Sequence, residues 1–169
     1  GIAHISYESA EEKLGSRHAV VVAPPDRFRL EVLSPLGALA VVTANGPELA
    51  VWVRRERRTY RGPATAASVG AYIGVPLRVA DVVAVLLGLP PERRATAPAT
   101  VAFDDTAGLI RVHVPIEGGR QDTWYAGDSA LPVASETTLP GAAQVLRVEF
   151  SGYRTIAGVA MPLDIDMRL

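Results

Sequence analysis

The sequence predicts a mainly β (α+β) fold, in which a curved antiparallel sheet forms a half-barrel and two short helices inserted mid-chain act as a lid. Three observations predict it: apolar and charged residues alternate in several segments, one stretch near the middle has a helical period, and turn-forming residues separate the segments. The chain has 169 residues, of which 49% are hydrophobic, enough for a real core. We therefore expect residues 1–169 to form a single domain.

Strands are predicted where apolar residues recur with period two, because successive side chains of a strand point to opposite faces. The strictest alternation covers 27–32, 110–114, 146–150 and 163–169, and shorter candidates are 2–8, 18–23, 39–44, 49–54, 58–61, 100–103 and 121–125. Turn sequences such as Pro24-Pro25-Asp26 and Asn45-Gly46-Pro47 join them. The sheet is therefore expected to be a meander, with irregular connections over 90–98 and 131–141.

Helices are predicted between residues 64 and 87, where the period changes. Val79, Val82, Val83, Leu86 and Leu87 have the spacing of one helix face, and Gly88 followed by Pro90-Pro91 ends that helix. A shorter helix is expected over about 65–73.

An apolar cavity follows from this architecture, because an antiparallel sheet must cover its apolar face and two short helices can cap a curled sheet without filling it. The alternation gives these candidate wall residues: Phe28, Leu30, Val32, Ile110, Val112, Val114, Val148, Phe150, Leu163, Ile165 and Met167. The candidate lid residues are Val69, Tyr72, Ile73, Val79, Val83, Leu86 and Leu87. For each of them, ordinary core packing is at least as good an interpretation as ligand contact.

Catalytic and metal-binding signals are absent from the sequence. It has no cysteine, no G-x-S-x-G nucleophile motif and no phosphate-binding loop, and its three histidines lack metal-ligand spacing. Asp104-Asp105 is expected to be part of a turn. Asp164 and Asp166 are expected to lie on the solvent-exposed face of an amphipathic strand. We therefore expect neither an enzyme nor a metal or other cofactor.

The concentrated charge at 54–58, Arg-Arg-Glu-Arg-Arg, is expected at a hairpin tip. No aromatic platform accompanies it and the net charge is -1, so no nucleic-acid partner is expected. Contact with anionic phospholipid or an acidic partner is one interpretation. A solvated hairpin end that discourages edge-to-edge association is the other, and it is the one the sequence favours.

The turn Ser34-Pro35-Leu36-Gly37 has an apolar residue in an unusual place. Proline suits the second position of a type I turn and glycine the fourth, which puts Leu36 at the outer corner. A leucine there either stands in water or on a neighbouring loop, or enters a bilayer or the apolar site of a partner.

Several segments resemble the LolB family, outer-membrane lipoprotein receptors of Gram-negative bacteria. The first is Arg29-Leu30-Glu31-Val32-Leu33-Ser34-Pro35-Leu36-Gly37. It is followed in the family's order by Thr59-Tyr60-Arg61, Ile73-Gly74-Val75-Pro76-Leu77, Leu86-Leu87-Gly88-Leu89-Pro90, Val148-Glu149-Phe150-Ser151-Gly152-Tyr153 and Ala160-Met161-Pro162. The resemblance runs from about residue 27 to the C-terminus, although 95–144 matches only in its strand pattern.

This resemblance implies a cavity for lipoprotein acyl chains or other lipid, and delivery of lipoproteins from a LolA-like periplasmic carrier to the inner leaflet of the outer membrane. It implies that Pro35, Leu36 and Gly37 form a membrane-insertion loop. The expected location is the periplasmic face of the outer membrane, with a lipid anchor on an N-terminal segment absent from this chain. The alternative is an envelope structural or sensory module that uses the same fold for protein–protein contact.

Overall fold

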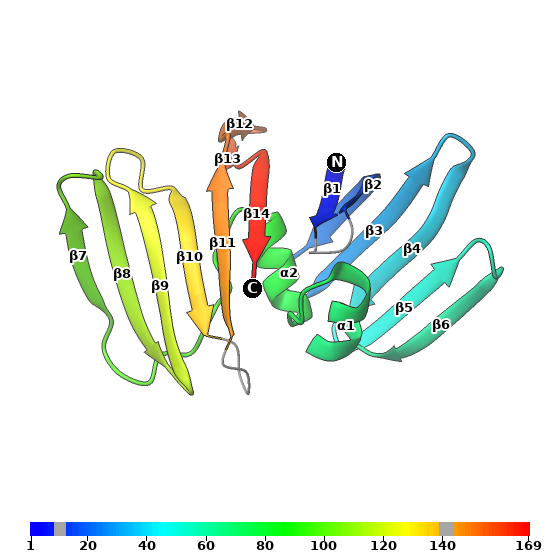
Figure 1. Cartoon of the computed structure of the whole chain (residues 1–169), viewed down its shortest axis with the longest axis horizontal. Helices are drawn as coiled ribbons and strands as arrows, with labels where there is room; N and C mark the ends of the chain where they lie inside the picture. Colours follow the sequence, from blue (N-terminus) through cyan, green and yellow to red (C-terminus); the bar gives the residue numbers. More distant parts are fainter. Residues whose placement is uncertain (9–12, 139–143) are drawn as a thin grey trace. The chain divides into compact units, whose positions relative to one another are not determined.

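The computed structural model describes residues 1–8, 13–138 and 144–169, which fold mainly as antiparallel strands with two short helices inserted mid-chain (Figure 1). The predicted fold class is confirmed. Among the described residues the strands form two open six-stranded sheets and one separate hairpin. The chain divides into two compact units, Gly1–Val83 and Ala84–Leu169, and each is described by itself. That a single domain spans residues 1–169 stays a prediction.

The first unit contains a six-stranded meander in which each strand pairs with the next along the chain. Its strands are β1 (Ile2–Glu8), β2 (Lys13–Ala23), β3 (Arg27–Ser34), β4 (Gly37–Asn45), β5 (Glu48–Val53) and β6 (Arg58–Pro63). Tight turns join β3 to β4, β4 to β5 and β5 to β6, as the turn residues predict. Gly46 adopts a φ of 59° in the turn between β4 and β5, a conformation that glycine takes without steric cost.

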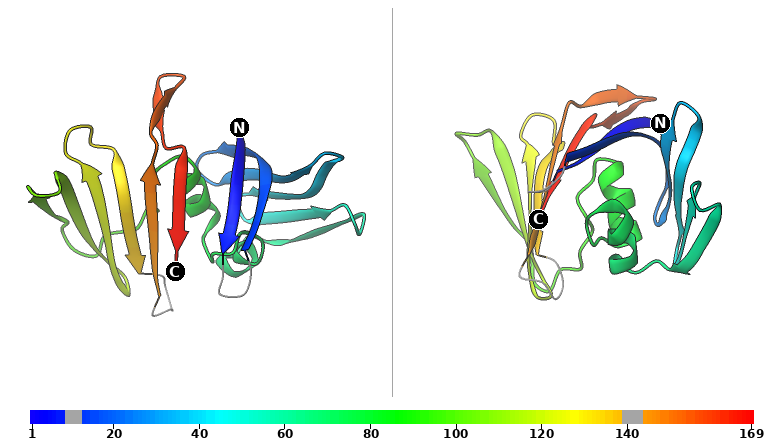
Figure 2. Two further views of the ribbon diagram at one scale, coloured as in Figure 1. Left: turned by 45° about the horizontal axis from the view of Figure 1, so that its top comes forward. Right: turned by 45° about the vertical axis from the view of Figure 1, so that its right-hand side comes forward.

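One face of this sheet is a hydrophobic core. The register sets Phe28 beside Ala44 and Leu30 beside Val42, and all four are buried. The helical segment lies next to the sheet (Figure 2), and its Val69 is also buried. Because Arg27 and Arg29 lie exposed on the opposite face, the helical segment covers the face of Phe28.

The helix α1 (Ala66–Ile73) has the ends that the sequence predicts. Thr65 is its N-cap, and the Thr65 Oγ1 accepts a hydrogen bond of 3.1 Å from the backbone N–H of Ser68. Gly74 caps the other end in a left-handed conformation. The second helix, α2 (Val79–Leu86), begins in the first unit and ends in the second.

The second unit contains the other six-stranded sheet, in the order β7-β8-β9-β10-β11-β14. Its strands are β7 (Thr100–Asp104), β8 (Leu109–Ile116), β9 (Gly119–Ala126), β10 (Pro132–Thr138), β11 (Val145–Ser151) and β14 (Asp164–Arg168). The short strands β12 (Arg154–Ile156) and β13 (Val159–Met161) form the separate hairpin between β11 and β14. Gly88 follows α2 with a φ of 77°, and an added Cβ there would lie 2.3 Å from Pro162 Cδ, so the position requires glycine.

One segment of the second unit differs from the prediction. The expectation of an irregular passage at 131–141 is wrong for residues 132–138, which form β10; residues 139–143 lie outside the described part. Small and polar residues such as Ala134, Ser135 and Thr137 occupy the buried positions of β10, so no apolar alternation marks it.

No helix in the described ranges is long and apolar enough to cross a bilayer.

Candidate functional site

An apolar surface on β7 and β8 is open to solvent. The antiparallel register sets Val101 opposite Val112 and Phe103 opposite Ile110, so these four side chains share one face of the sheet. Val114 continues the same face along β8. The side chain of Val101 is 69% exposed and that of Phe103 is 59% exposed. We call these five residues the β7–β8 apolar surface. Contiguous exposed apolar side chains of this kind mark interaction sites more often than isolated ones do.

On the same face of the sheet, next to the β7–β8 apolar surface, β9 and β10 carry buried polar side chains. Gln121 Nε2 donates a hydrogen bond of 2.6 Å to the carbonyl of Pro91 in the connector and one of 3.1 Å to Thr137 Oγ1. The hydroxyls of Thr123 and Ser135 lie 3.4 Å apart. The connector, residues 90–98, therefore contacts β9 through Pro91, and its Ala95 and Thr96 lie beside Ile116 and Pro115 at the end of β8.

The predicted wall residues fall into three groups. Phe28, Leu30, Val148 and Phe150 are buried in core, at 7% exposure or less. Val32, Ile110, Val112, Val114 and Ile165 are half-buried, whereas Leu163 and Met167 are exposed. The structure brings Ile110, Val112 and Val114 together on β8, and it sets Val148 opposite Met167 and Phe150 opposite Ile165. The three residues of β3 belong to the other unit.

The predicted lid residues are divided in the same way. Val69, Val79 and Val83 are buried, Ile73, Leu86 and Leu87 are half-buried, and Tyr72 is 49% exposed. Their role as a lid, like the role of the wall residues, stays a prediction.

Val101 and Phe103 are site residues that the sequence reasoning missed. Residues 100–103 are recognisable as a strand, but only two apolar positions alternate in it. The sequence does contain a signal for them: Val101-Ala102-Phe103 alternates in the same way as 110–114. This match indicates a shared apolar face only once the two strands are known to pair.

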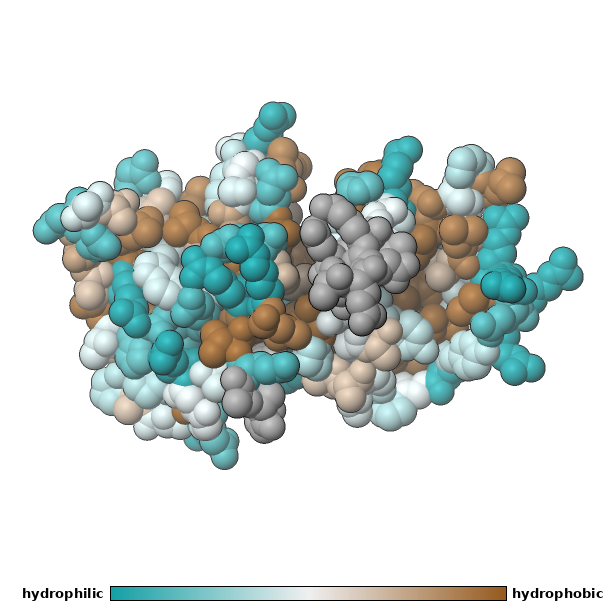
Figure 3. Space-filling model, in the orientation of Figure 1, coloured by the Kyte–Doolittle hydropathy of each residue, from teal (hydrophilic) through white to brown (hydrophobic). Residues whose placement is uncertain are grey.

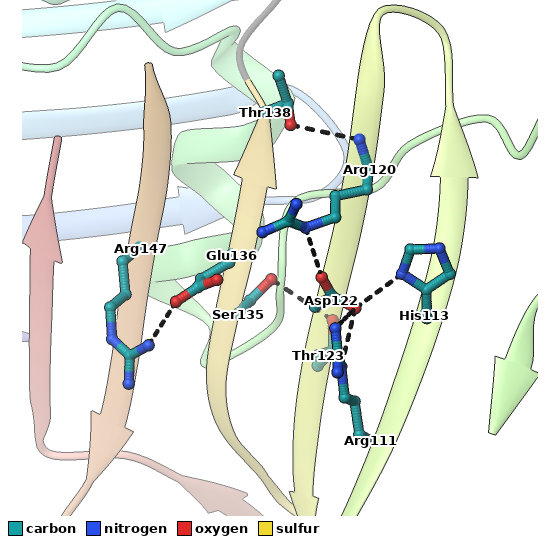
Figure 4. A network of polar contacts seen from close by, with 9 residues as sticks. All are labelled: Arg111, His113, Arg120, Asp122, Thr123, Ser135, Glu136, Thr138 and Arg147. Atoms are coloured by element: carbon teal, nitrogen blue, oxygen red, sulfur yellow. Dashed lines mark hydrogen bonds and ion pairs between the residues drawn. The ribbon is translucent and has the colours of Figure 1, made fainter. Parts of the chain in front are cut away.

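The opposite face of the second sheet is a network of paired charges centred on Asp122 (Figure 4). The carboxylate of Asp122 is buried and lies 2.9 Å from Arg111 Nη2, 2.8 Å from His113 Nδ1 and 2.9 Å from Arg120 Nε. Burial raises the pKa of Asp122, but hydrogen bonds from His113 and Arg111 outweigh burial and lower it below its usual value. Figure 3 shows the hydrophilic residues that gather over this sheet.

This network satisfies its own charges and has the character of a solvated structural face. Arg147 pairs with Glu136 at 2.6 Å and with Glu149 at 2.8 Å, and the guanidinium groups of Arg111 and Arg147 lie over the ring of Trp124. His113 has a carboxylate partner that sequence spacing concealed, because Asp122 lies on the neighbouring strand. In the described ranges no three His, Cys, Asp or Glu residues gather as metal ligands would.

Two shallow depressions lie away from the predicted cavity residues. One, of about 170 Å³, is lined by Thr100, Ala102, Arg111 and His113. The other, of about 410 Å³, is lined by Pro47, Glu48, Leu49, Ala50, Arg61, Gly62 and Pro63. Neither contains a predicted wall or lid residue, so the apolar cavity itself stays a prediction.

The turn between β3 and β4 holds Leu36 out in solvent, where its side chain is 82% exposed. Ser34 Oγ accepts a hydrogen bond of 3.2 Å from the backbone N–H of Leu36 and donates one of 2.7 Å to the carbonyl of Gly37. Gly37 adopts a φ of 102°, which closes the turn. The predicted placement of Leu36 at an outer corner therefore agrees with its exposure.

Comparison with known proteins identifies the fold. No protein-family model matches the chain, and no curated protein matches it in sequence. Three solved structures are similar along nearly its whole length. A protein domain from Vibrio parahaemolyticus, assigned to outer membrane lipoprotein sorting, has a TM-score of 0.62 at 11% identity, covering 98% of this chain and 76% of that one.

The other two similar structures agree with the first. A DUF1329 family protein from Desulfovibrio piger has a TM-score of 0.60 at 13% identity, covering 99% of this chain and 77% of that one. A LolA superfamily protein from Nitrosomonas europaea has a TM-score of 0.57 at 10% identity, covering 98% of this chain and 74% of that one. The chain thus has a LolA-like fold.

Proposed function

We propose that this chain binds the acyl chains of lipoproteins and helps deliver lipoproteins to the outer membrane, as a LolB-like receptor and not as an enzyme. The observation that carries the proposal is the β7–β8 apolar surface, where Val101 and Phe103 are more than half exposed. The LolA-like fold supports it, because one similar structure is a domain assigned to outer membrane lipoprotein sorting.

The chemistry of the surface fits reversible binding of hydrocarbon. Burying an acyl chain gains about 0.8 kcal/mol per CH₂, so even partial contact with a long chain stabilises a complex. The five side chains offer aliphatic and aromatic carbon without a polar group to select one headgroup. Such a surface holds many different acyl chains and releases them when a bilayer offers a better environment.

The remaining parts of the proposal concern the partners and the cellular location. A LolA-like periplasmic carrier would supply the lipoprotein, and the inner leaflet of the outer membrane would receive it. Leu36, exposed at its turn, is the residue through which cargo would pass into the bilayer. The proposed location is the periplasmic face of the outer membrane.

The proposal is tested by lipid uptake. Purified protein is extracted with organic solvent to identify bound lipid, and the delipidated protein is then titrated with an apolar fluorophore. The double variant Val101→Asp/Phe103→Asp should bind the fluorophore at least about tenfold more weakly, because two carboxylates would have to be desolvated beside it.

Ala102→Asp is the matched control, because Ala102 is exposed on the other face of the same strand, and it should leave uptake unchanged. A wild-type protein that carries no lipid and takes up no fluorophore would contradict the proposal and favour an envelope module that works through protein contacts. Equal losses in the variant and the control would contradict the assignment of the surface.

A further inference from the structure

Two hairpin turns of the first sheet are joined at one end of it. The turn of residues 34–37 connects β3 to β4, and the turn of residues 54–57 connects β5 to β6. The backbone N–H of Arg54 donates a hydrogen bond of 2.9 Å to the carbonyl of Leu39, and Arg54 Nη1 donates one of 2.6 Å to the carbonyl of Leu36. The apolar turn and the arginine-rich turn therefore form one continuous surface.

The arginines of this surface outnumber its acidic residues four to one. Arg54, Arg55, Arg57 and Arg58 are all exposed, and none forms an ion pair with a described carboxylate. The one acidic residue among them, Glu56, accepts a hydrogen bond from the Tyr60 hydroxyl, and this bond raises the pKa of Tyr60. By contrast, Arg111, Arg120 and Arg147 on the second sheet each pair with a carboxylate.

Two leucines stand among these unpaired charges. Leu36 is 82% exposed and Leu39 is 47% exposed. An apolar tip surrounded by long cationic side chains matches the layering of an anionic bilayer, whose phosphates lie above its acyl chains. Basic residues near such a surface each contribute to attraction, and a small apolar wedge adds to it.

We infer that the four arginines give this end of the first sheet, next to the turn of Leu36 already assigned to membrane insertion, its selectivity for a membrane surface rich in anionic phospholipid. The leucines enter the boundary between headgroups and acyl chains, and the guanidinium groups bind the phosphates. The inference rests on the proposed function, since it supplies the membrane contact that delivery requires. It assigns the arginine cluster to that contact, in place of the solvated hairpin end that the sequence alone favours.

A flotation assay with lipid vesicles tests the inference. The wild-type protein should bind vesicles of phosphatidylethanolamine and phosphatidylglycerol, bind vesicles of phosphatidylcholine much more weakly, and lose binding as salt is raised. The double variant Arg55→Gln/Arg57→Gln should bind the anionic vesicles about 25-fold more weakly, at about fivefold for each arginine.

The matched control is Arg27→Gln/Arg61→Gln, which removes two exposed arginines from the other end of the same strands. It should bind anionic vesicles as the wild type does. Equal binding of the wild type to both kinds of vesicle, no binding to either, or an equal loss in the control would overturn the inference. Fluorophore uptake, which should be unchanged in both double variants, reports separately on the proposed function.

Discussion

The apolar face around Phe28 and the β7–β8 apolar surface arise from the same sequence pattern but have different surroundings. In the first sheet, alternating apolar residues are covered by the helical segment, and Phe28 is 4% exposed. In the second sheet, the same alternation leaves Phe103 59% exposed, next to Val101 at 69%. Leaving apolar carbon in water forgoes its contribution to stability, at about 25 cal/mol per Å². The covered face therefore stabilises the fold, and the open face is available for a ligand.

Replacing Phe28 and, separately, Phe103 by alanine should give the largest difference in the free energy of unfolding between the two faces. Phe28→Ala should lower the free energy of unfolding by about 3–5 kcal/mol, because it opens a cavity in packed core. Phe103→Ala should cost under about 1 kcal/mol, because its side chain contacts few protein atoms. Urea denaturation followed by circular dichroism measures both.

Phe150→Ala is the control for the second unit, since Phe150 is 3% exposed in the same sheet as Phe103. It should behave like Phe28→Ala. Similar losses from Phe103→Ala and Phe150→Ala would mean that the β7–β8 apolar surface is ordinary core, and the contrast between the two faces would disappear.

The charged face of the second sheet should contribute a smaller amount of stability and nothing to uptake. Asp122→Asn should lower the free energy of unfolding by about 2 kcal/mol at neutral pH, because it weakens charge-assisted hydrogen bonds to a buried group. Asp166→Asn, whose carboxylate is 53% exposed and pairs with Arg168, should cost under about 0.5 kcal/mol. Fluorophore affinity should be the same in both variants and in the wild type.

The stabilisation from Asp122 should depend on pH. Its pKa is lower in the folded protein than the unfolded value of 3.8, so its contribution is complete above pH 3.8 and is lost as the pH falls through the folded pKa. The difference in stability between wild type and Asp122→Asn should therefore shrink on acidification below pH 3.8. A difference that stays constant across this range would contradict the electrostatic origin of the effect.

Much of the fold was predictable because its signals are local. Period-two alternation identifies β3, β8, β11 and β14, and the helical stripe that begins at Val79 together with Gly88 identifies α2 and its end. Strand β10 escaped prediction because its buried positions hold Ala134, Ser135 and Thr137 in place of large apolar residues. Ala134 is small, and the hydroxyls of Ser135 and Thr137 lie within hydrogen-bond distance of Thr123 and Gln121 on β9. The hairpin of β12 and β13 was missed because each strand has only three residues.

Less of the candidate site was predictable, because burial depends on what packs against a strand. Phe28 and Ile110 look alike in sequence, yet one lies in core and the other on the open surface. The pairing of His113 with Asp122 and of Arg54 with the carbonyl of Leu36 requires the cross-strand and cross-turn register. No local pattern reports these contacts.

Photocrosslinking with a diazirine-labelled fatty acid, followed by mass spectrometry of the labelled peptides, tests the central claim most directly. We expect saturable labelling to fall on residues 100–104 and 109–116 and to be displaced by an unlabelled fatty acid. Labelling confined to the face of Asp122, or labelling that unlabelled fatty acid does not displace, would contradict this claim.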